Sequence, residues 1–119
     1  MRSASPPLDA ARTDILFHAL GDPNRRRIVA LLAERPASVS ELATSLAISK
    51  TAIGQHLAVL ERAQLAHSSK VGRVRTCRFD PAGLAVLQQW IDHHRHEWTE
   101  RLDRLEDLLT NVKVTGDGE

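Results

Sequence analysis

The feature that most constrains this chain is a pair of short amphipathic segments with almost nothing between them. Ser40 is predicted to cap the first helix and Ser49 the second, because a serine hydroxyl accepts a hydrogen bond from the free N–H groups of the first turn. Only Ala47 and Ile48 separate the segments, so the two helices have to cross and form a helix-turn-helix. The predicted inward-facing residues are Leu42, Ala43 and Leu46 in the first helix and Ile53, Leu57 and Leu60 in the second.

A predicted β-hairpin follows the second helix directly. Strand-like runs cover residues 65–70 and 74–79, and Gly72 between them offers the positive φ that a tight turn needs. Every charge on this hairpin before Asp80 is positive. An edge hairpin with protective charges is the alternative, but edge protection does not require a single sign. The hairpin therefore favours a winged helix-turn-helix, a mainly α fold with a small β-hairpin wing.

Two further helices are predicted before this region. Apolar residues recur at helical spacing over residues 8–20. The dipeptide Asp22-Pro23 then starts a second helix, with aspartate as cap and proline in the first turn, and Arg35-Pro36 ends it.

A long amphipathic helix is predicted over about residues 81–112. At 1.5 Å per residue it spans roughly 45 Å, more than a domain of this size can cover. Its apolar stripe follows a heptad-like spacing with one stutter near Trp98. We expect the stripe to contact the same helix of a second copy, so that the protein dimerises through its terminal helices; packing against the first helix alone is the alternative. The predicted dimer interface comprises Ile15, Leu16, Leu87, Ile91, His94, Trp98, Leu102, Leu105 and Leu109.

Charge is unevenly distributed along the chain, although the net charge of its 119 residues is only +1. Residues 24–78 carry ten basic and three acidic side chains, whereas residues 79–119 carry four basic and nine acidic ones. A basic middle beside an acidic end indicates a polyanion-binding face and a separate surface with another role, with chance clustering as the alternative.

The length predicts one domain, which we expect to cover residues 8–112, with a disordered tip at 1–7 and a flexible tail at 113–119. No run of about 20 uncharged apolar residues is present to cross a membrane, and no basic-then-apolar leader opens the sequence. We therefore expect a cytoplasmic protein without membrane contact. Neither a glycine-rich phosphate loop nor a nucleophile elbow occurs, so we expect no enzymatic activity.

Several motifs, taken in order, resemble the ArsR-type winged-helix repressors. Residues 22–32 read DPNRRRIVALL, residues 40–43 read SELA and residues 55–60 read QHLAVL, similar to that family's DPxRRxILxLL, ELA and QHLxxL segments. Gly72-Arg73 is similar to its wing. The resemblance covers about residues 13–112. It implies homodimeric, sequence-specific DNA binding, usually repression of a nearby promoter and often of the protein's own gene.

One departure from that family concerns sensing. Its metal-sensing members carry two cysteines where this chain has Ser38 and Ser40, and serine hydroxyls are poor ligands for soft metals. The family's Asp and His site on the last helix is also incomplete, because Leu105 stands eleven residues after His94. We therefore predict no metal and no cofactor, and the effector is unknown.

The remaining histidines and the cysteine leave alternatives open. The i,i+4 pairs His93/Glu97 and His96/Glu100 could each offer two metal ligands, although surface side chains are the simpler interpretation. Cys77 is expected to be a small buried filler, with a redox switch as the alternative.

The second helix of the pair supplies the predicted base contacts. A rotation of 100° per residue places Thr51 and Gln55 opposite the buried Ile53. Glutamine can pair with adenine, and the threonine methyl group can pack on thymine. His56 is expected either to contact phosphate or to make a structural hydrogen bond, and Arg25–Arg27 either contact phosphate or are solvated. The predicted DNA-binding residues are Lys50, Thr51, Gln55, His56, Arg62, Lys70, Arg73 and Arg75.

The sequence thus predicts a homodimeric repressor that binds a near-palindromic operator in double-stranded DNA and can regulate its own gene. The alternative is a helical protein-interaction module whose basic face is incidental.

Overall fold

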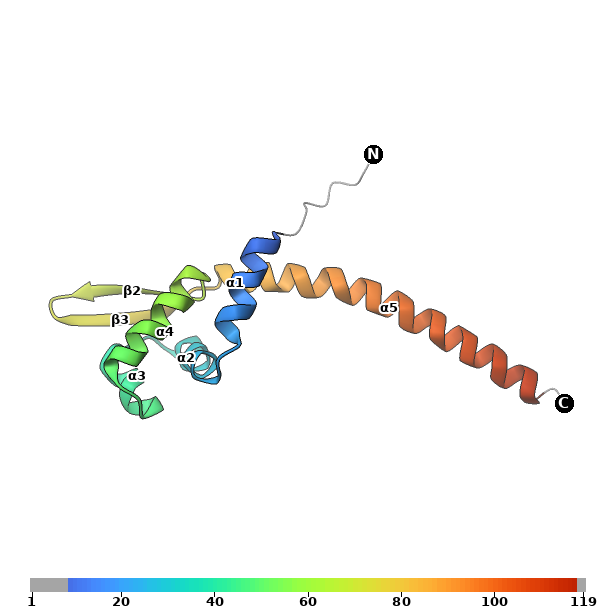
Figure 1. Cartoon of the computed structure of the whole chain (residues 1–119), viewed down its shortest axis with the longest axis horizontal. Coiled ribbons are helices and arrows are strands. Elements are labelled where there is room, and N and C mark those ends of the chain that lie inside the picture. The colour runs from blue at the N-terminus through green and yellow to red at the C-terminus, as the bar shows by residue number, and fades with distance from the viewer. Residues whose placement is uncertain (1–8, 118–119) are drawn as a thin grey trace. The chain divides into compact units, whose positions relative to one another are not determined.

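The computed structural model describes residues 9–117, with side chains over residues 9–111. Two compact units follow one another, the first ending at Leu87 and the second starting at Gln88. The first contains all the strands described and every helix up to the start of the last one, and the second continues that last helix (Figure 1). The expected disordered tip at residues 1–7 lies outside the described residues.

The first two helices are α1 (Ala10–Leu20) and α2 (Pro23–Glu34). The Asp22 carboxylate accepts hydrogen bonds from the first N–H groups of α2, which confirms the predicted aspartate cap. Burial opposes ionisation of Asp22, but these donors hold its pKa below the usual value. Arg25 and Arg26 donate to backbone carbonyls at the end of α1 at 2.6–3.1 Å. The two arginines therefore stabilise the C-terminus of α1, where the helix dipole favours cations.

The helix-turn-helix consists of α3 (Val39–Leu46) and α4 (Lys50–Arg62). The predicted cap of α3 at Ser40 is wrong, because Ser38 occupies this position. The Ser38 hydroxyl accepts from the Glu41 N–H at 3.1 Å, and the Glu41 carboxylate accepts from the Ser38 N–H at 2.8 Å. These hydrogen bonds to Ser38 also hold the pKa of Glu41 below its usual value.

A small antiparallel sheet has the strand order β1-β3-β2. β2 (Ala66–Val71) and β3 (Val74–Phe79) form the predicted hairpin, with Val71 opposite Val74. β1 (Ala37–Ser38) pairs with the other edge of β3 and was not predicted. Two residues are too few to show the alternation by which a strand is recognised in a sequence.

An apolar core joins α1–α4, the sheet and the start of the last helix, α5 (Ala82–Asp117). Its largest fully buried side chains are Leu16, Ile28, Leu42, Ile53, Leu57, Leu60, Leu65 and Cys77. The prediction that Leu16 contacts a second copy is wrong, because it is 1% exposed and packs inside this core. Its neighbour Ile15 lies at the core's edge and is partly exposed. Helical spacing shows which residues share a face and does not show which element covers that face.

The last helix, α5 (Ala82–Asp117), starts close to the predicted position and extends past the predicted end. The Ala82 N–H donates to the Asp80 carboxylate at 3.0 Å. The expected flexible tail at 113–119 is helical as far as Asp117, since no glycine or proline precedes Gly116 in this stretch, and its last two residues lie outside the described part. Among the described residues, none of the helices combines the length and apolar character that a membrane crossing requires.

Candidate nucleic-acid interface

The turn before α4 orients this helix. Ala47 adopts a left-handed conformation with φ 58°, which residues other than glycine seldom do, and it closes the end of α3. The Ser49 hydroxyl then accepts from the Ala52 N–H at 3.0 Å, so α4 begins where the sequence predicts. The chain turns sharply between the two helices, and α4 lies against α3 (Figure 1).

α4 buries one face and exposes the other, as its periodicity predicts. The buried residues are Ile53, Leu57 and Leu60, and the exposed ones are Lys50, Thr51, Gln55, Ala58 and Arg62. A Cβ atom placed on Gly54 would meet nothing within 4 Å. The first turns of α4 therefore offer polar side chains and an open backbone to an outside partner.

The β2–β3 hairpin, called the wing below, projects beside α4 (Figure 1). Gly72 turns the chain at its tip with φ 63°, as predicted. Lys70 and Arg73 are exposed there. The tip valines Val71 and Val74 are also exposed, so apolar surface lies between the cations. A tip that combines cations with apolar side chains suits a nucleic-acid groove.

The structure brings the start of α4 and the wing together around one hollow. This hollow, called the basic hollow below, has a volume of about 420 Å³. Its lining residues are Ser38, Val39, Ser40, Lys50, Gly54, Lys70, Arg73, Val74 and Arg75. Cations from two elements that are distant in the sequence therefore face the same space, an arrangement that suits a phosphate backbone.

Arg75 has a protein partner within this arrangement. Its guanidinium Nη2 donates to the Glu61 carboxylate at 2.8 Å, and its Nε donates to the Ser68 hydroxyl at 2.9 Å. The Ser68 hydroxyl in turn donates to Glu61 at 3.2 Å. The guanidinium of Arg75, which the sequence assigns to phosphate, is thus paired with a protein carboxylate in an ion pair that links the wing to α4.

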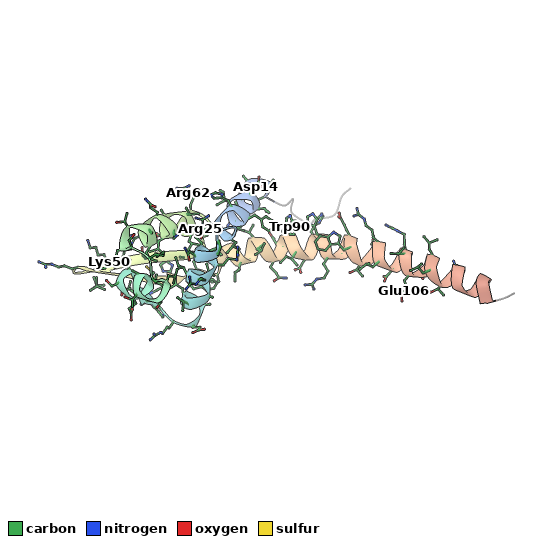
Figure 2. All side chains as sticks on the ribbon, turned by 60° about the horizontal axis from the view of Figure 1, so that its bottom comes forward. Asp14, Arg25, Lys50, Arg62, Trp90 and Glu106 are labelled. Carbon is green, nitrogen blue, oxygen red and sulfur yellow. The ribbon has the colours of Figure 1, made fainter. Side chains whose placement is uncertain are left out.

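Four predicted DNA-binding residues do not line the basic hollow, namely Thr51 and Gln55 on the exposed face of α4, His56 and Arg62. His56 is half-buried, with its Nδ1 atom 3.4 Å from the guanidinium of Arg25, which fits the structural hydrogen bond better than the phosphate contact. Arg62 lies at the other end of α4 from Lys50, next to α1 (Figure 2). At 1.5 Å per residue, these two ends are about 18 Å apart.

The candidate metal ligands on α5 form pairs within the helix. His93 lies 3.5 Å from Glu97, and His96 lies 3.1 Å from Glu100. Over the described residues, no group of three or more His, Cys, Asp or Glu side chains is arranged to hold a metal ion.

Cys77 is buried between neighbouring strands, as predicted for a filler, and this burial raises the pKa of its thiol.

The second unit carries an exposed apolar stripe along α5. Trp98 is 46% exposed, Leu102 63%, Leu105 51% and Leu109 60%. Nearer the first unit, His94 is partly buried and its ring stacks on Trp90, with ring centroids 4.2 Å apart. Leu87 belongs to the edge of the core, and Ile91 is partly exposed. The helix thus presents large apolar side chains for most of its described length.

Comparisons with known proteins agree on one family. The profile of the family described as "Bacterial regulatory protein, arsR family" matches residues 22–68. The chain is 40% identical to the HTH-type transcriptional regulator Rv2034 of Mycobacterium tuberculosis, over 81% of this chain and 87% of that protein. It is 38% identical to the uncharacterized HTH-type transcriptional regulator YuzN of Bacillus subtilis, over 66% of this chain and 95% of that one.

The solved structures show the same fold. An ArsR-like transcriptional regulator from Rhodococcus sp. RHA1 superposes with a TM-score of 0.73 at 33% identity, over 85% of this chain and 93% of that chain. The mainly α architecture with a β-hairpin wing is therefore a winged helix-turn-helix, as the sequence predicts.

Proposed function

The chain belongs to the bacterial ArsR family of transcriptional regulators, and from this membership we infer that it binds a specific double-stranded DNA sequence through α4 and the wing. The observation that carries this proposal is the basic hollow, where Lys50 of α4 faces Lys70 and Arg73 of the wing. A DNA backbone in this hollow would meet cations on both sides. The adjacent turns of α4 would then enter the major groove.

Within this arrangement the residues divide by task. Thr51 and Gln55 are exposed on the first turns of α4, and we assign them to base edges, glutamine to adenine and the threonine methyl to thymine. Lys50, Lys70 and Arg73 contact phosphates or the neighbouring minor groove. Phosphate contacts contribute affinity for any DNA sequence, whereas the two α4 side chains supply the choice of sequence.

A second copy is the partner that best covers the stripe on α5. Leu87, Trp98 and Leu109 are eleven residues apart, and Ile91, Leu102, His94 and Leu105 repeat the same interval. Eleven residues make three turns of 3.67 residues, so the stripe stays on one side of a helix that supercoils only slightly and to the right. Two such helices from identical chains can pair along this side. The heptad-like spacing with one stutter near Trp98, noted in the sequence, is this same repeat.

Dimerisation bears directly on the DNA target. A two-fold axis relating two copies would present two α4 helices to DNA, which implies two half-sites about one helical turn apart and a near-palindromic operator. A regulator that occupies such a site within a promoter blocks transcription. We therefore propose that the protein represses nearby genes, its own gene included.

DNA binding is tested by fluorescence anisotropy with the duplex upstream of the protein's own gene and a scrambled duplex. We expect the first duplex to bind more tightly, with an affinity that falls steeply with salt as counterions are released. Gln55→Ala should reduce discrimination between the duplexes, whereas Arg73→Ala should weaken binding to both by a similar factor. Equal losses on both duplexes for both variants would contradict the assigned roles.

Dimerisation is tested separately by analytical ultracentrifugation. Leu105→Glu places a carboxylate in the stripe of each subunit and should weaken the dimer at least about thirtyfold. Thr99→Glu adds the same charge at an exposed position beside the stripe and should have a much smaller effect. A monomeric wild-type protein, or equal effects of the two variants, would overturn the proposed interface.

The exposed stripe also supports a second candidate, a module that docks a different protein. A wild-type chain that stays monomeric and binds neither duplex above background would favour this alternative.

A further inference from the structure

Glu61 is the acidic member of a three-residue contact between α4 and the wing. Its carboxylate accepts from the Arg75 guanidinium at 2.8 Å and from the Ser68 hydroxyl at 3.2 Å. Arg75 also donates from Nε to Ser68 at 2.9 Å, so each of the three side chains contacts the other two. Both charged side chains are partly buried, which weakens solvent screening of their attraction. One residue of α4 therefore holds both strands of the wing.

The charge pattern of the wing explains why it needs such a partner. Lys70 and Arg75 stand directly opposite each other in the β2–β3 register, and like charges in this position repel. The Arg75–Glu61 ion pair offsets this repulsion on the side of the hairpin that faces α4. It also turns the guanidinium of Arg75 toward a protein carboxylate.

We propose that Glu61 is a positioning residue for DNA binding, which sets the wing at a defined place beside α4 through Arg75 and Ser68. Arg75 acts through Glu61 and contacts no phosphate. This inference rests on the proposed function, since it concerns how the wing reaches DNA. It implies that the phosphate contact of Arg73, at the wing tip, depends on the ion pair further down the hairpin.

Exchanging the charges of Glu61 and Arg75 distinguishes a positioning role of Arg75 from a direct contact between Arg75 and phosphate. Arg75→Glu breaks the ion pair and adds a negative charge, whereas the double variant Glu61→Arg/Arg75→Glu restores a pair with the same net charge as the wild type. The Ser68 hydroxyl can serve either orientation, because it both donates and accepts. The matched control Glu61→Arg/Arg78→Glu has the same net charge, but its new carboxylate replaces an exposed arginine on the same strand.

For the wild type and each of these variants, the affinity for the upstream duplex is measured with and without the additional substitution Arg73→Ala. In the wild type we expect Arg73→Ala to cost about tenfold in affinity, the value of one charged hydrogen bond. In the Arg75→Glu background the cost should fall below about twofold, because the displaced wing no longer brings Arg73 to the DNA. The exchanged pair should regain the tenfold cost and bind within about threefold of the wild type, and the control should regain neither.

Two results would overturn the proposal. The first is an Arg73→Ala cost that stays the same in the Arg75→Glu background. The second is an exchanged pair that binds as weakly as Arg75→Glu alone, which would mean that Arg75 itself contacts DNA. If Arg75→Glu does not fold, Ser68→Ala removes one side of the contact and should reduce the Arg73→Ala cost by a smaller factor; an unchanged cost there also counts against the proposal.

Hydrogen exchange on the free protein tests the contact among Glu61, Ser68 and Arg75 in the absence of DNA. Arg75→Glu should accelerate amide exchange across residues 66–79, and the exchanged pair should reverse this acceleration. If the wild type fails to bind any duplex, the proposed function is wrong. The hydrogen-exchange rates of the wing amides still show whether Glu61 positions the wing. Exchange that is unchanged by Arg75→Glu would refute the positioning role in that case.

Discussion

The substitution Gly83→Ala tests how closely the start of α5 packs against the end of α4. A Cβ atom at this position would lie 2.5 Å from the carbonyl oxygen of Ala63 and 2.7 Å from that of Gln64. The shorter distance is about 0.9 Å below the 3.4 Å at which ordinary contact begins. Both clashing atoms belong to the backbone, so no side-chain rotation relieves them. The Gly83 N–H also donates to the Gln64 carbonyl at 2.7 Å, and a shift that relieves the clash lengthens this hydrogen bond.

The size of the effect of Gly83→Ala follows from these contacts. Overpacking costs about 1–3 kcal/mol, and a weakened backbone hydrogen bond costs about 0.5–1.5 kcal/mol. The better helix propensity of alanine returns up to about 1 kcal/mol. We therefore expect Gly83→Ala to lower the free energy of unfolding by about 2 kcal/mol and Tm by about 8–16 °C.

Gly54→Ala is the matched control, because the same atom is added to a helical glycine with nothing within 4 Å. Here only helix propensity and the entropy of the unfolded chain change, so the variant should be more stable by about 0.5–1 kcal/mol. Thermal unfolding followed by far-UV circular dichroism measures both variants. Our reasoning would be refuted if Gly83→Ala melted at or above the wild-type temperature, or if both substitutions shifted Tm in the same direction.

Three further predictions concern a cap, acid unfolding and the buried thiol. Ser38→Ala removes the cap of α3 and should lower the free energy of unfolding in urea by about 1 kcal/mol, whereas Ser40→Ala should have little effect; the reverse order would restore Ser40 as the cap. The lowered pKa values of Asp22 and Glu41 mean that their stabilising effect is complete above the unfolded-state values near pH 4 and is lost as pH falls through the lower folded-state values. Asp22→Asn should therefore flatten the decline in stability between about pH 5 and pH 2, and an unchanged slope would count against this. Burial and a raised pKa should keep the Cys77 thiol from reacting with Ellman's reagent until the protein unfolds, so fast labelling of the native protein would contradict its burial.

Much of the fold and of the exposed face of α4 could be predicted from the sequence, because the sequence signals are local. The aspartate cap at Asp22, the serine cap at Ser49 and the turn at Gly72 each depend on groups within a few residues of one another. The exposed positions of Thr51 and Gln55 follow from the period of a single helix whose buried face is apolar. Interactions of this range are visible in a single sequence, since the chain itself sets their geometry.

Other positions share a different property, which is that a distant segment determines what their side chains contact. Leu16 lies in an apolar stripe of α1, but only the packing of the other elements decides that this stripe is part of the core. Arg75 looks like any cation of the wing until Glu61, fourteen residues earlier, is placed beside it. Arg25 likewise reaches His56, thirty-one residues away, through the packing of α2 against α4.

The amino-acid sequence by itself determined the succession of helices, the tight turn, the positively charged wing and the apolar stripe of α5, because capping and periodicity act over one or two turns. Only the tertiary structure decided which cations face the basic hollow and which are already paired with protein groups. The reason is physical: the partner of a charge depends on which surfaces the buried core brings within about 3 Å, and that choice is made by the packing of the whole unit.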